Sequence, residues 1–291
     1  MKIKRKIIPA ISILFLYLLH VNQSCAQQTE IRSIPWGAMY APLDIMKSYG
    51  MTGTITYYRG DGGVKKLFSD LAEARRCRIK LIITLGDVRP STYADQQGKI
   101  DMAKVREELS PFVKISGQLR SYIEDGTIWA IRFMDEPHDP SGLPQGISIN
   151  TEDLGAVMLY LKQSFGSVRV GSTAPARYMV NVSNADWCFG QYCHRTAGRR
   201  GIDPVQFIKE DAALAKKMGM SYVASLNAST NPVDNKTFFE TYLAFASIPD
   251  VDFLTSWQWQ QGRYPSSFEK RITDPSVQSL VTRITQACMR K

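Results

Sequence analysis

Short apolar stretches rich in β-branched and aromatic residues alternate along this chain with segments of helical periodicity. This alternation is typical of parallel sheets whose strands are connected by helices. Eight strand–helix units within about 265 residues match the size of a closed barrel. The pattern therefore predicts an α/β fold made of a single (β/α)8 TIM barrel. The expected strands are 34–40, 53–58, 80–85, 127–134, 167–172, 185–190, 221–226 and 251–257.

Several expected helices carry clear sequence signals. Apolar residues recur at helical spacing in 64–71 and 154–165, and Gly166 follows the second stripe as an expected C-cap. A capping side chain before proline marks three expected helix starts, because proline at the first helical position loses no hydrogen bond. These pairs are Ser110-Pro111, Asp203-Pro204 and Asp274-Pro275.

The fifth unit is the weakest part of the barrel pattern. Little room for a full helix exists between Thr173 and Asn184, so we expect this βα unit to be degenerate. A doubly wound open sheet is the alternative fold. That fold commonly carries a glycine-rich dinucleotide-binding turn after its first strand, and this chain has none there.

The N-terminus resembles a signal peptide. Four basic residues precede an apolar run from Ile7 to Val21, and Ser24-Cys25-Ala26 follows as a cleavage point. The run is too short for a membrane span, so we expect no stable membrane insertion after cleavage. The pattern predicts a signal peptide over 1–26, a catalytic domain over 27–291, and a secreted or periplasmic protein. A lipid anchor at Cys25 is the alternative, although Asn22 stands where such anchors usually have an aliphatic residue.

Charge and composition argue against several classes of partner. The formal net charge is +9 and falls to +5 without the leader, and the basic residues are scattered rather than clustered. The chain is therefore not expected to bind nucleic acid. No cysteine–histidine spacing resembles a zinc site, and only His138 and His194 remain after the leader. No metal and no organic cofactor are expected, and the oligomeric state is left open.

Four cysteines remain in the mature chain. Export permits disulfides. Cys188 and Cys193 are close enough in sequence to close a small loop, and we predict a bridge between them. Cys77 and Cys288 fall on expected helices, and a second bridge between these two is possible.

The barrel prediction itself selects the candidate functional residues, because active sites of such barrels lie at the C-terminal ends of the strands. Carboxylates, arginines and aromatic residues gather at those positions. The residues are Tyr40, Arg59, Asp61, Asp87, Arg89, Asp135, Glu136, His138, Arg177, Tyr178, Gln191, Tyr192, His194, Asn227, Trp257 and Gln258.

This set of residue types suits a sugar. Carboxyl groups perform acid and base catalysis on a glycosidic bond, polar groups bind hydroxyls, and aromatic rings stack on the sugar's C–H face. We expect Glu136, Asp135, Asp87 and Asp61 to be the catalytic candidates. The candidates for substrate binding are Arg59, Tyr40, His138, Tyr192, Asn227, Trp257 and Gln258.

The segment Ile-Arg-Phe-Met-Asp-Glu-Pro at 131–137 resembles the end of the fourth strand in (β/α)8-barrel glycoside hydrolases, where an Asn-Glu-Pro motif often supplies the acid/base glutamate. The resemblance implies that Glu136 is the general acid and that Trp257 is an aromatic platform beneath the sugar. The chain departs from the pattern in two places. Asp135 replaces the asparagine, and the seventh expected strand leads to Asn227 instead of a glutamate nucleophile.

Two mechanisms would operate without that nucleophile. In an inverting reaction, Asp61 or Asp87 would activate water opposite Glu136, with the carboxyl groups roughly 6.5–9.5 Å apart. In a substrate-assisted reaction, Asp135 and Glu136 would act as a dyad similar to that of the β-N-acetylhexosaminidases. The substrate would then supply its own nucleophile.

Other interpretations of the same residues remain. Arg132 and Glu136 share one face of a regular strand and could form a buried ion pair, and Asp61 could simply belong to a glycine-rich turn. A non-catalytic carbohydrate-binding barrel, derived from a glycosidase, is the leading alternative to a hydrolase. A barrel acting on another ester is less favoured, because no Gly-x-Ser-x-Gly motif is present.

Overall fold

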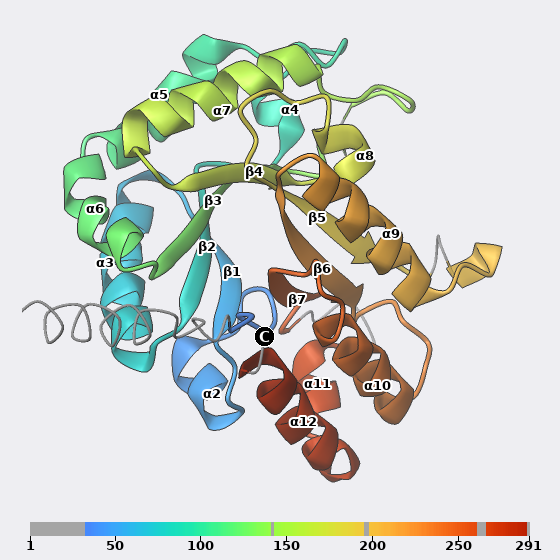
Figure 1. Ribbon diagram of the computed structural model, residues 1–291. Helices are drawn as coiled ribbons and strands as arrows, with labels where there is room; N and C mark the ends of the chain where they lie inside the picture. Colours follow the sequence, from blue (N-terminus) through green and yellow to red (C-terminus); the bar gives the residue numbers. More distant parts are fainter. Residues whose placement is uncertain (1–32, 141–142, 195–197, 261–265, 290–291) are drawn as a thin grey trace, which may run out of the picture. The chain divides into compact units, whose positions relative to one another are not determined.

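The computed structural model describes residues 33–140, 143–194, 198–260 and 266–289. Within them, seven parallel strands lie side by side in the order of the sequence and curve into a barrel (Figure 1). The (β/α)-barrel prediction is confirmed. The strands are β1 (Gly53–Tyr58), β2 (Lys80–Leu85), β3 (Ile128–Asp135), β4 (Arg169–Thr173), β5 (Trp187–Tyr192), β6 (Ser221–Asn227) and β7 (Phe253–Trp257).

The segment 34–40 lies between β7 and β1, where the first strand was predicted. The N–H groups of Gly37 and Met39 donate to carbonyl oxygens of β7, and that of Tyr40 donates to Ile55 of β1. Only Trp36 forms a regular bridge, with Leu254 of β7. Tyr40 has a left-handed φ of 62°, which ends the extended run before a longer ladder forms.

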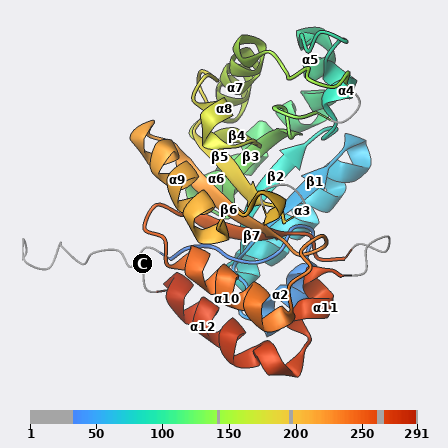
Figure 2. The ribbon, with the colours of Figure 1, turned by 90° about the vertical axis from the view of Figure 1, so that its right-hand side faces the viewer.

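Helices cover the outside of the barrel between successive strands (Figures 1 and 2). The fifth expected strand, 167–172, corresponds to β4. The unit after it contains a single four-residue helix, α8, as we predicted from the few residues available between Thr173 and Asn184. The α-helices are α2 (Leu43–Ser48), α3 (Gly60–Cys77), α4 (Pro90–Tyr93), α5 (Met102–Val113), α6 (Ser116–Glu124), α7 (Thr151–Phe165), α8 (Ala176–Met179), α9 (Pro204–Lys217), α10 (Asn235–Ala246), α11 (Phe268–Ile272) and α12 (Gln278–Met289). Two 3-10 turns, η1 (Gly198–Arg200) and η2 (Pro275–Val277), complete the order.

The predicted helix starts are confirmed in two of three cases. Asp203 and Asp274 accept backbone N–H groups at the starts of α9 and η2. The prediction at Ser110 is wrong, because Pro111 lies inside α5. That helix already begins at the Asp101 cap, and the chain continues helically past the proline to Val113.

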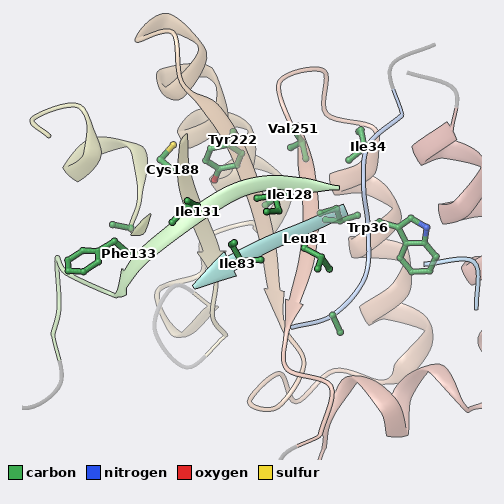
Figure 3. Close-up of a cluster of buried hydrophobic side chains, with 14 of the residues drawn as sticks. Ile34, Trp36, Leu81, Ile83, Ile128, Ile131, Phe133, Cys188, Tyr222 and Val251 are labelled. Atoms are coloured by element: carbon green, nitrogen blue, oxygen red, sulfur yellow. The ribbon is translucent and has the colours of Figure 1, made fainter. Parts of the chain in front are cut away.

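The apolar residues form two layers that follow the alternation along each strand. Eight residues fill the barrel interior: Met39, Ile55, Ile82, Ala130, Trp187, Phe189, Val223 and Phe253. A larger layer lies between the strands and the helices, and Figure 3 shows part of it, including Leu81, Ile83, Ile131 and Phe133. Trp259 belongs to this outer layer and is 2 % exposed, so its ring packs in the core.

The predicted disulfide between Cys188 and Cys193 is wrong. Cys188 is a buried free thiol on β5. An extended strand rises about 3.3 Å per residue, so five residues carry the chain roughly 16 Å along, whereas bridged Cα atoms lie within about 7 Å. Cys77 is likewise a free thiol, which excludes the possible second bridge to Cys288.

The predicted signal peptide over 1–26, with Cys25, lies outside the described residues. Within the part of the chain that the structure describes, no helix is both long enough and apolar enough to cross a membrane.

Candidate active site

The end of β3 is built around a β-bulge. The pairing of β3 with β4 shifts between Arg132 and Asp135, and Met134 has a left-handed φ of 67°. Phe133 and Met134 both pack in the outer layer, whereas Arg132 lies inside the barrel. The extra outward residue changes the alternation, so Asp135 returns to the same side as Arg132.

Asp135 is held in place by two neighbours. Its Oδ1 lies 3.5 Å from Nη1 of Arg132 and accepts a 2.5 Å hydrogen bond from the Thr173 hydroxyl on β4. Arg132 is fully buried, and its Nε and Nη2 donate to Thr84 (2.6 Å) and to the Tyr40 hydroxyl (3.2 Å). The buried ion pair suggested by the sequence therefore forms with Asp135, because the bulge moves Glu136 off the face of Arg132.

Glu136 follows directly, with a left-handed φ of 45°. Among the described residues, no group donates a hydrogen bond to its carboxyl oxygens. Part of the residue is open to solvent. The side chain is nevertheless partly desolvated by the protein around it, and this desolvation raises the pKa of Glu136 to about 7. The charges of Asp135 and Asp139 raise this pKa further, and Arg132 opposes them. Glu136 is thus an accessible carboxyl group that can carry a proton near neutral pH.

Asp87, at the end of β2, is saturated with donors. Its carboxylate accepts hydrogen bonds from the backbone N–H and the guanidinium of Arg89, and lies 3.1 Å from Nη1 of Arg59. These hydrogen bonds from Arg89 lower the pKa of Asp87 to about 2. Arg59 also pairs with Glu108 of α5 at 3.0 Å. Asp87 and Arg59 therefore both lie at the rim, but their charged groups form an ion pair with each other.

Asp61 lies in the first turn of α3, where its side chain is exposed. The glycine-rich segment around it is thus the start of a helix, and a carboxylate is favourable there next to the helix dipole. Among the described residues, the Asp61 side chain makes no hydrogen bond and no ion pair, whereas Asp87 and Asp135 are both paired with arginines.

Three aromatic rings lie together at the mouth of the barrel, the end at which the C-termini of the strands meet. The Tyr40 ring meets Trp257 edge to face at 6.0 Å between centroids and meets Tyr57 at 5.8 Å. Tyr57 is 52 % exposed and was missed as a candidate from the sequence. Alternation along β1 indicates its position: Ile55 points into the barrel, so Tyr57, two positions later, points to the same side at the end of the strand. Gln258 follows Trp257 through a cis peptide, and its amide donates to Gln260 at 3.1 Å.

Tyr192 is turned away from the mouth. It is 4 % exposed, its hydroxyl donates to the carbonyl of Ile202, and its ring packs on Phe207 of α9. Alternation explains this result, since Phe189 lies inside the barrel and Gln191 therefore takes the inward position near the end of β5. This neighbour, rather than Tyr192, is placed to meet a ligand.

The two remaining candidates have different surroundings. His138 packs beside Tyr178 of α8 at 6.0 Å, and burial lowers its pKa. Asn227 is 6 % exposed, and its side-chain oxygen accepts the N–H groups of Ser229 and Thr230. Asn227 thus shapes the turn after β6, which is the seventh strand expected from the sequence.

Among the described residues, no group of three or more histidine, cysteine, aspartate or glutamate side chains is placed to hold a metal ion. The groups described above at the mouth are carboxyl groups, guanidinium groups, amides and aromatic rings.

Solved structures with the same architecture are numerous, although no family model and no curated protein sequence matches the chain. The Pseudomonas stutzeri endoglucanase Cel5A superimposes with a TM-score of 0.59 at 12 % identity, over 86 % of this chain and 93 % of that one. A glycoside hydrolase family 5 mannosidase from Rhizomucor miehei gives 0.55 at 12 % identity, over 86 % and 88 %. An endo-beta-1,4-glucanase from Xanthomonas axonopodis pv. citri gives 0.55 at 12 %, over 88 % and 96 %.

The fold is similar to that of glycoside hydrolase family 5 barrels. At this level of identity, the similarity to the family 5 barrels lies in the fold, and the residues at the mouth determine the chemistry.

Proposed function

We propose that the protein is a glycoside hydrolase that acts on a polysaccharide or other glycan, with Glu136 as its general acid. The observation that carries the proposal is the state of Glu136: its carboxyl group is accessible, has no hydrogen-bond donor among the described residues, and has a pKa raised to about 7. A general acid works best when its pKa lies near the working pH, because it is then protonated and still releases its proton readily.

The neighbouring groups support a sugar as the substrate. Tyr40, Tyr57 and Trp257 offer ring faces and edges, and Gln191 is placed to bind hydroxyls. The barrel neighbours include enzymes named as endoglucanases and as a mannosidase, which favours the same class of substrate.

For the second catalytic group, the contacts favour Asp135 over Asp87. The oxygens of Asp87 are occupied by two arginines, and a carboxylate with a pKa of about 2 is a weak base. Asp135 is fixed by Arg132 and Thr173 beside Glu136, as a residue that orients a substrate group needs to be. We therefore propose the substrate-assisted dyad, in which Asp135 orients an acetamido group of the sugar, the carbonyl oxygen of that group attacks the anomeric carbon, and Glu136 protonates the leaving oxygen; Asp61 as the base of an inverting reaction is the alternative.

The test is cleavage of a glycan panel by the wild-type protein and by Glu136→Gln, with detection of new reducing ends. The proposal expects the variant to lose activity by about 10²–10⁴-fold, the usual contribution of a general acid. NMR of the first-formed anomer then separates the mechanisms. Retention supports the dyad, and inversion supports a base such as Asp61.

A non-catalytic carbohydrate-binding barrel is the second candidate. The observation that favours it is Asn227, whose side chain caps a turn where a retaining hydrolase would have its nucleophile. Binding of glycans without cleavage, and with affinity unchanged in Glu136→Gln, would establish this function instead.

We also propose that the protein works outside the cytoplasm, since the N-terminal pattern is that of a signal peptide. Mass spectrometry of the mature protein tests this proposal. A chain that begins at Gln27 supports soluble export, and a lipid-modified Cys25 supports an anchored form.

A further inference from the structure

A crevice of about 880 Å³ lies on the outer side of β1, where α2 and α3 meet. Figure 1 shows α2 and α3 side by side next to this strand. The walls come from the outward face of β1, from the start of α2, and from one face of α3. A volume of this size is within the range of ligand sites, roughly 300–1,000 Å³.

The crevice exists because this part of the barrel is poorly filled. The helix α2 has 6 residues, against 18 in α3, and covers little of the strand. On β1 the outward positions are Thr54, Thr56 and Tyr58, and the two threonines pair with the larger, buried Leu81 and Ile83 of β2. The smaller threonine side chains leave space; the Thr54 hydroxyl is buried and donates to the carbonyl oxygen of Ala38, whereas Thr56 is half-buried and borders the crevice.

The wall formed by α3 is polar and ordered. The Tyr58 hydroxyl donates to Asp70 at 2.9 Å, and Lys66 pairs with the same carboxylate. The Lys66 ammonium also lies 5.7 Å from the centre of the Tyr58 ring. Hydrogen-bonding groups held in this way can bind hydroxyls without first becoming ordered.

The charges of the lining favour an uncharged ligand. Three carboxylates line the crevice, Asp44, Asp70 and Glu73, against the two cations Arg59 and Lys66. Most of these charges are already paired, Lys66 with Asp70, Glu73 with Arg76, and Arg59 with Asp87 and Glu108. Neither cation of the lining is therefore left without a carboxylate partner and available to hold a uronic acid or a sulfated sugar. Neutral sugar hydroxyls can donate to the carboxylates and accept from the ammonium.

The crevice is continuous with the mouth. Tyr40, Tyr57 and Arg59 line it, and the same Tyr40 ring contacts Trp257 at the end of β7. A chain of aromatic rings therefore leads from the mouth to the crevice. We propose that the crevice is an accessory subsite for a neutral sugar unit, a branch or a distal residue of the glycan whose reacting bond lies at Glu136. This inference rests on the proposed function for the identity of the ligand.

Gly62 allows a direct test. It lines the crevice in the first turn of α3, its residue is exposed, and a Cβ built there meets no atom within 4 Å. Gly62→Trp should therefore fill the crevice without disturbing the core. Gly117→Trp is the matched control, because Gly117 lies on α6 and its Cβ position is equally open. Thermal denaturation of both variants shows that they fold.

Both substitutions are made in Glu136→Gln protein, and binding is measured by calorimetry with cellohexaose, mannohexaose and N-acetylchitohexaose, and with the three corresponding trisaccharides. We expect Gly62→Trp to weaken binding of a hexasaccharide about tenfold and to leave trisaccharide binding unchanged. Gly117→Trp should change neither affinity.

The outcomes separate this inference from the proposed hydrolase. If wild-type protein cleaves glycans but Gly62→Trp and Gly117→Trp bind every hexasaccharide alike, the subsite is overturned and the hydrolase stands. If nothing is cleaved but Gly62→Trp alone loses hexasaccharide affinity, the subsite stands and the hydrolase falls. If the protein binds no hexasaccharide, the subsite is overturned as well.

Discussion

Arg132 Nη1 lies 3.5 Å from Asp135 Oδ1 at the end of β3, although three residues of a regular strand would place the two side chains on opposite faces. The bulge between them brings both side chains into the barrel. The buried guanidinium is therefore neutralised by Asp135, and Glu136 remains beside the pair as a carboxyl group without an ion-pair partner of its own among the described residues. This arrangement makes the protonation of Glu136 sensitive to Asp135.

The activity should fall at alkaline pH. The raised pKa of about 7 means that Glu136 is protonated below this value and loses its proton above it. A general acid must be protonated, so kcat/KM should decrease about tenfold for each pH unit above roughly 7. A pH profile of kcat/KM for the wild-type protein on a cleaved glycan measures this decrease, the alkaline limb of the profile. An unchanged kcat/KM between about pH 6 and pH 9 would exclude Glu136 as the acid.

Asp135→Asn should move that alkaline limb to lower pH. The negative charge of Asp135 is the largest charge effect that raises the pKa of Glu136, so its removal lowers that pKa. At pH 7 a smaller fraction of Glu136 is then protonated, and activity drops. Asp139→Asn is the control: it should shift the limb in the same direction but by less, since Asp139 is the weaker of the two charges. A limb at the same pH in wild type and Asp135→Asn would contradict the coupling.

Asp87→Asn should destabilise the protein without abolishing catalysis. The hydrogen bonds from Arg89 hold the pKa of Asp87 at about 2, below its ordinary value of 3.8. The charged form therefore contributes stability that is present above about pH 4 and is lost as the pH falls through about 2. The loss at neutral pH is on the order of 2 kcal/mol, from about 1.4 kcal/mol per pKa unit.

Urea unfolding of Asp87→Asn at pH 7 measures this loss, and Asp61→Asn, at a position in the first turn of α3, is the control with little expected change. If Asp87→Asn instead keeps its stability and loses activity by about a hundredfold or more, Asp87 is the catalytic base.

Tyr57→Ala should weaken glycan binding. The ring is 52 % exposed and packs edge to face on Tyr40 at the mouth. Truncating an aromatic residue that contacts a ligand commonly costs about 1–2 kcal/mol, which corresponds to roughly a tenfold rise in Kd. Tyr160→Ala, on α7 and away from the mouth, serves as the comparison. Equal affinities of the two variants would remove Tyr57 from the binding surface.

The positions of seven of the eight expected strands followed from the sequence, because apolar, β-branched segments are a local signal. The expected strand 34–40 forms only an isolated bridge, at Trp36. The limits of β1 and β2 agree with the predicted ones, and those of β3 to β7 differ by one or two residues. The short α8 also followed, since the distance between two strands limits the length of any helix between them. The disulfide prediction failed because sequence proximity does not determine spatial distance once both cysteines lie along one extended segment.

The site could be predicted only to the level of the rim. The C-terminal ends of the strands, and Glu136 among them, followed from the barrel pattern and from the Asp-Glu-Pro segment. Asp87 and Arg59 looked like free functional groups, but the fold brings them together with Arg89 into an ion cluster. Tyr192 was predicted to bind the sugar, but alternation along β5 turns its side chain toward α9.

The sequence alone determined which segments form the barrel and which residues lie near its mouth, because periodicity and strand ends are properties of the local chain. Only the tertiary structure decided how those residues are paired and which side they face. A bulge at Met134 changes the alternation by one position, and the partners of Arg132 and Asp87 come from strands and helices far away in sequence. Such pairings depend on distances across the closed barrel, which no local pattern encodes.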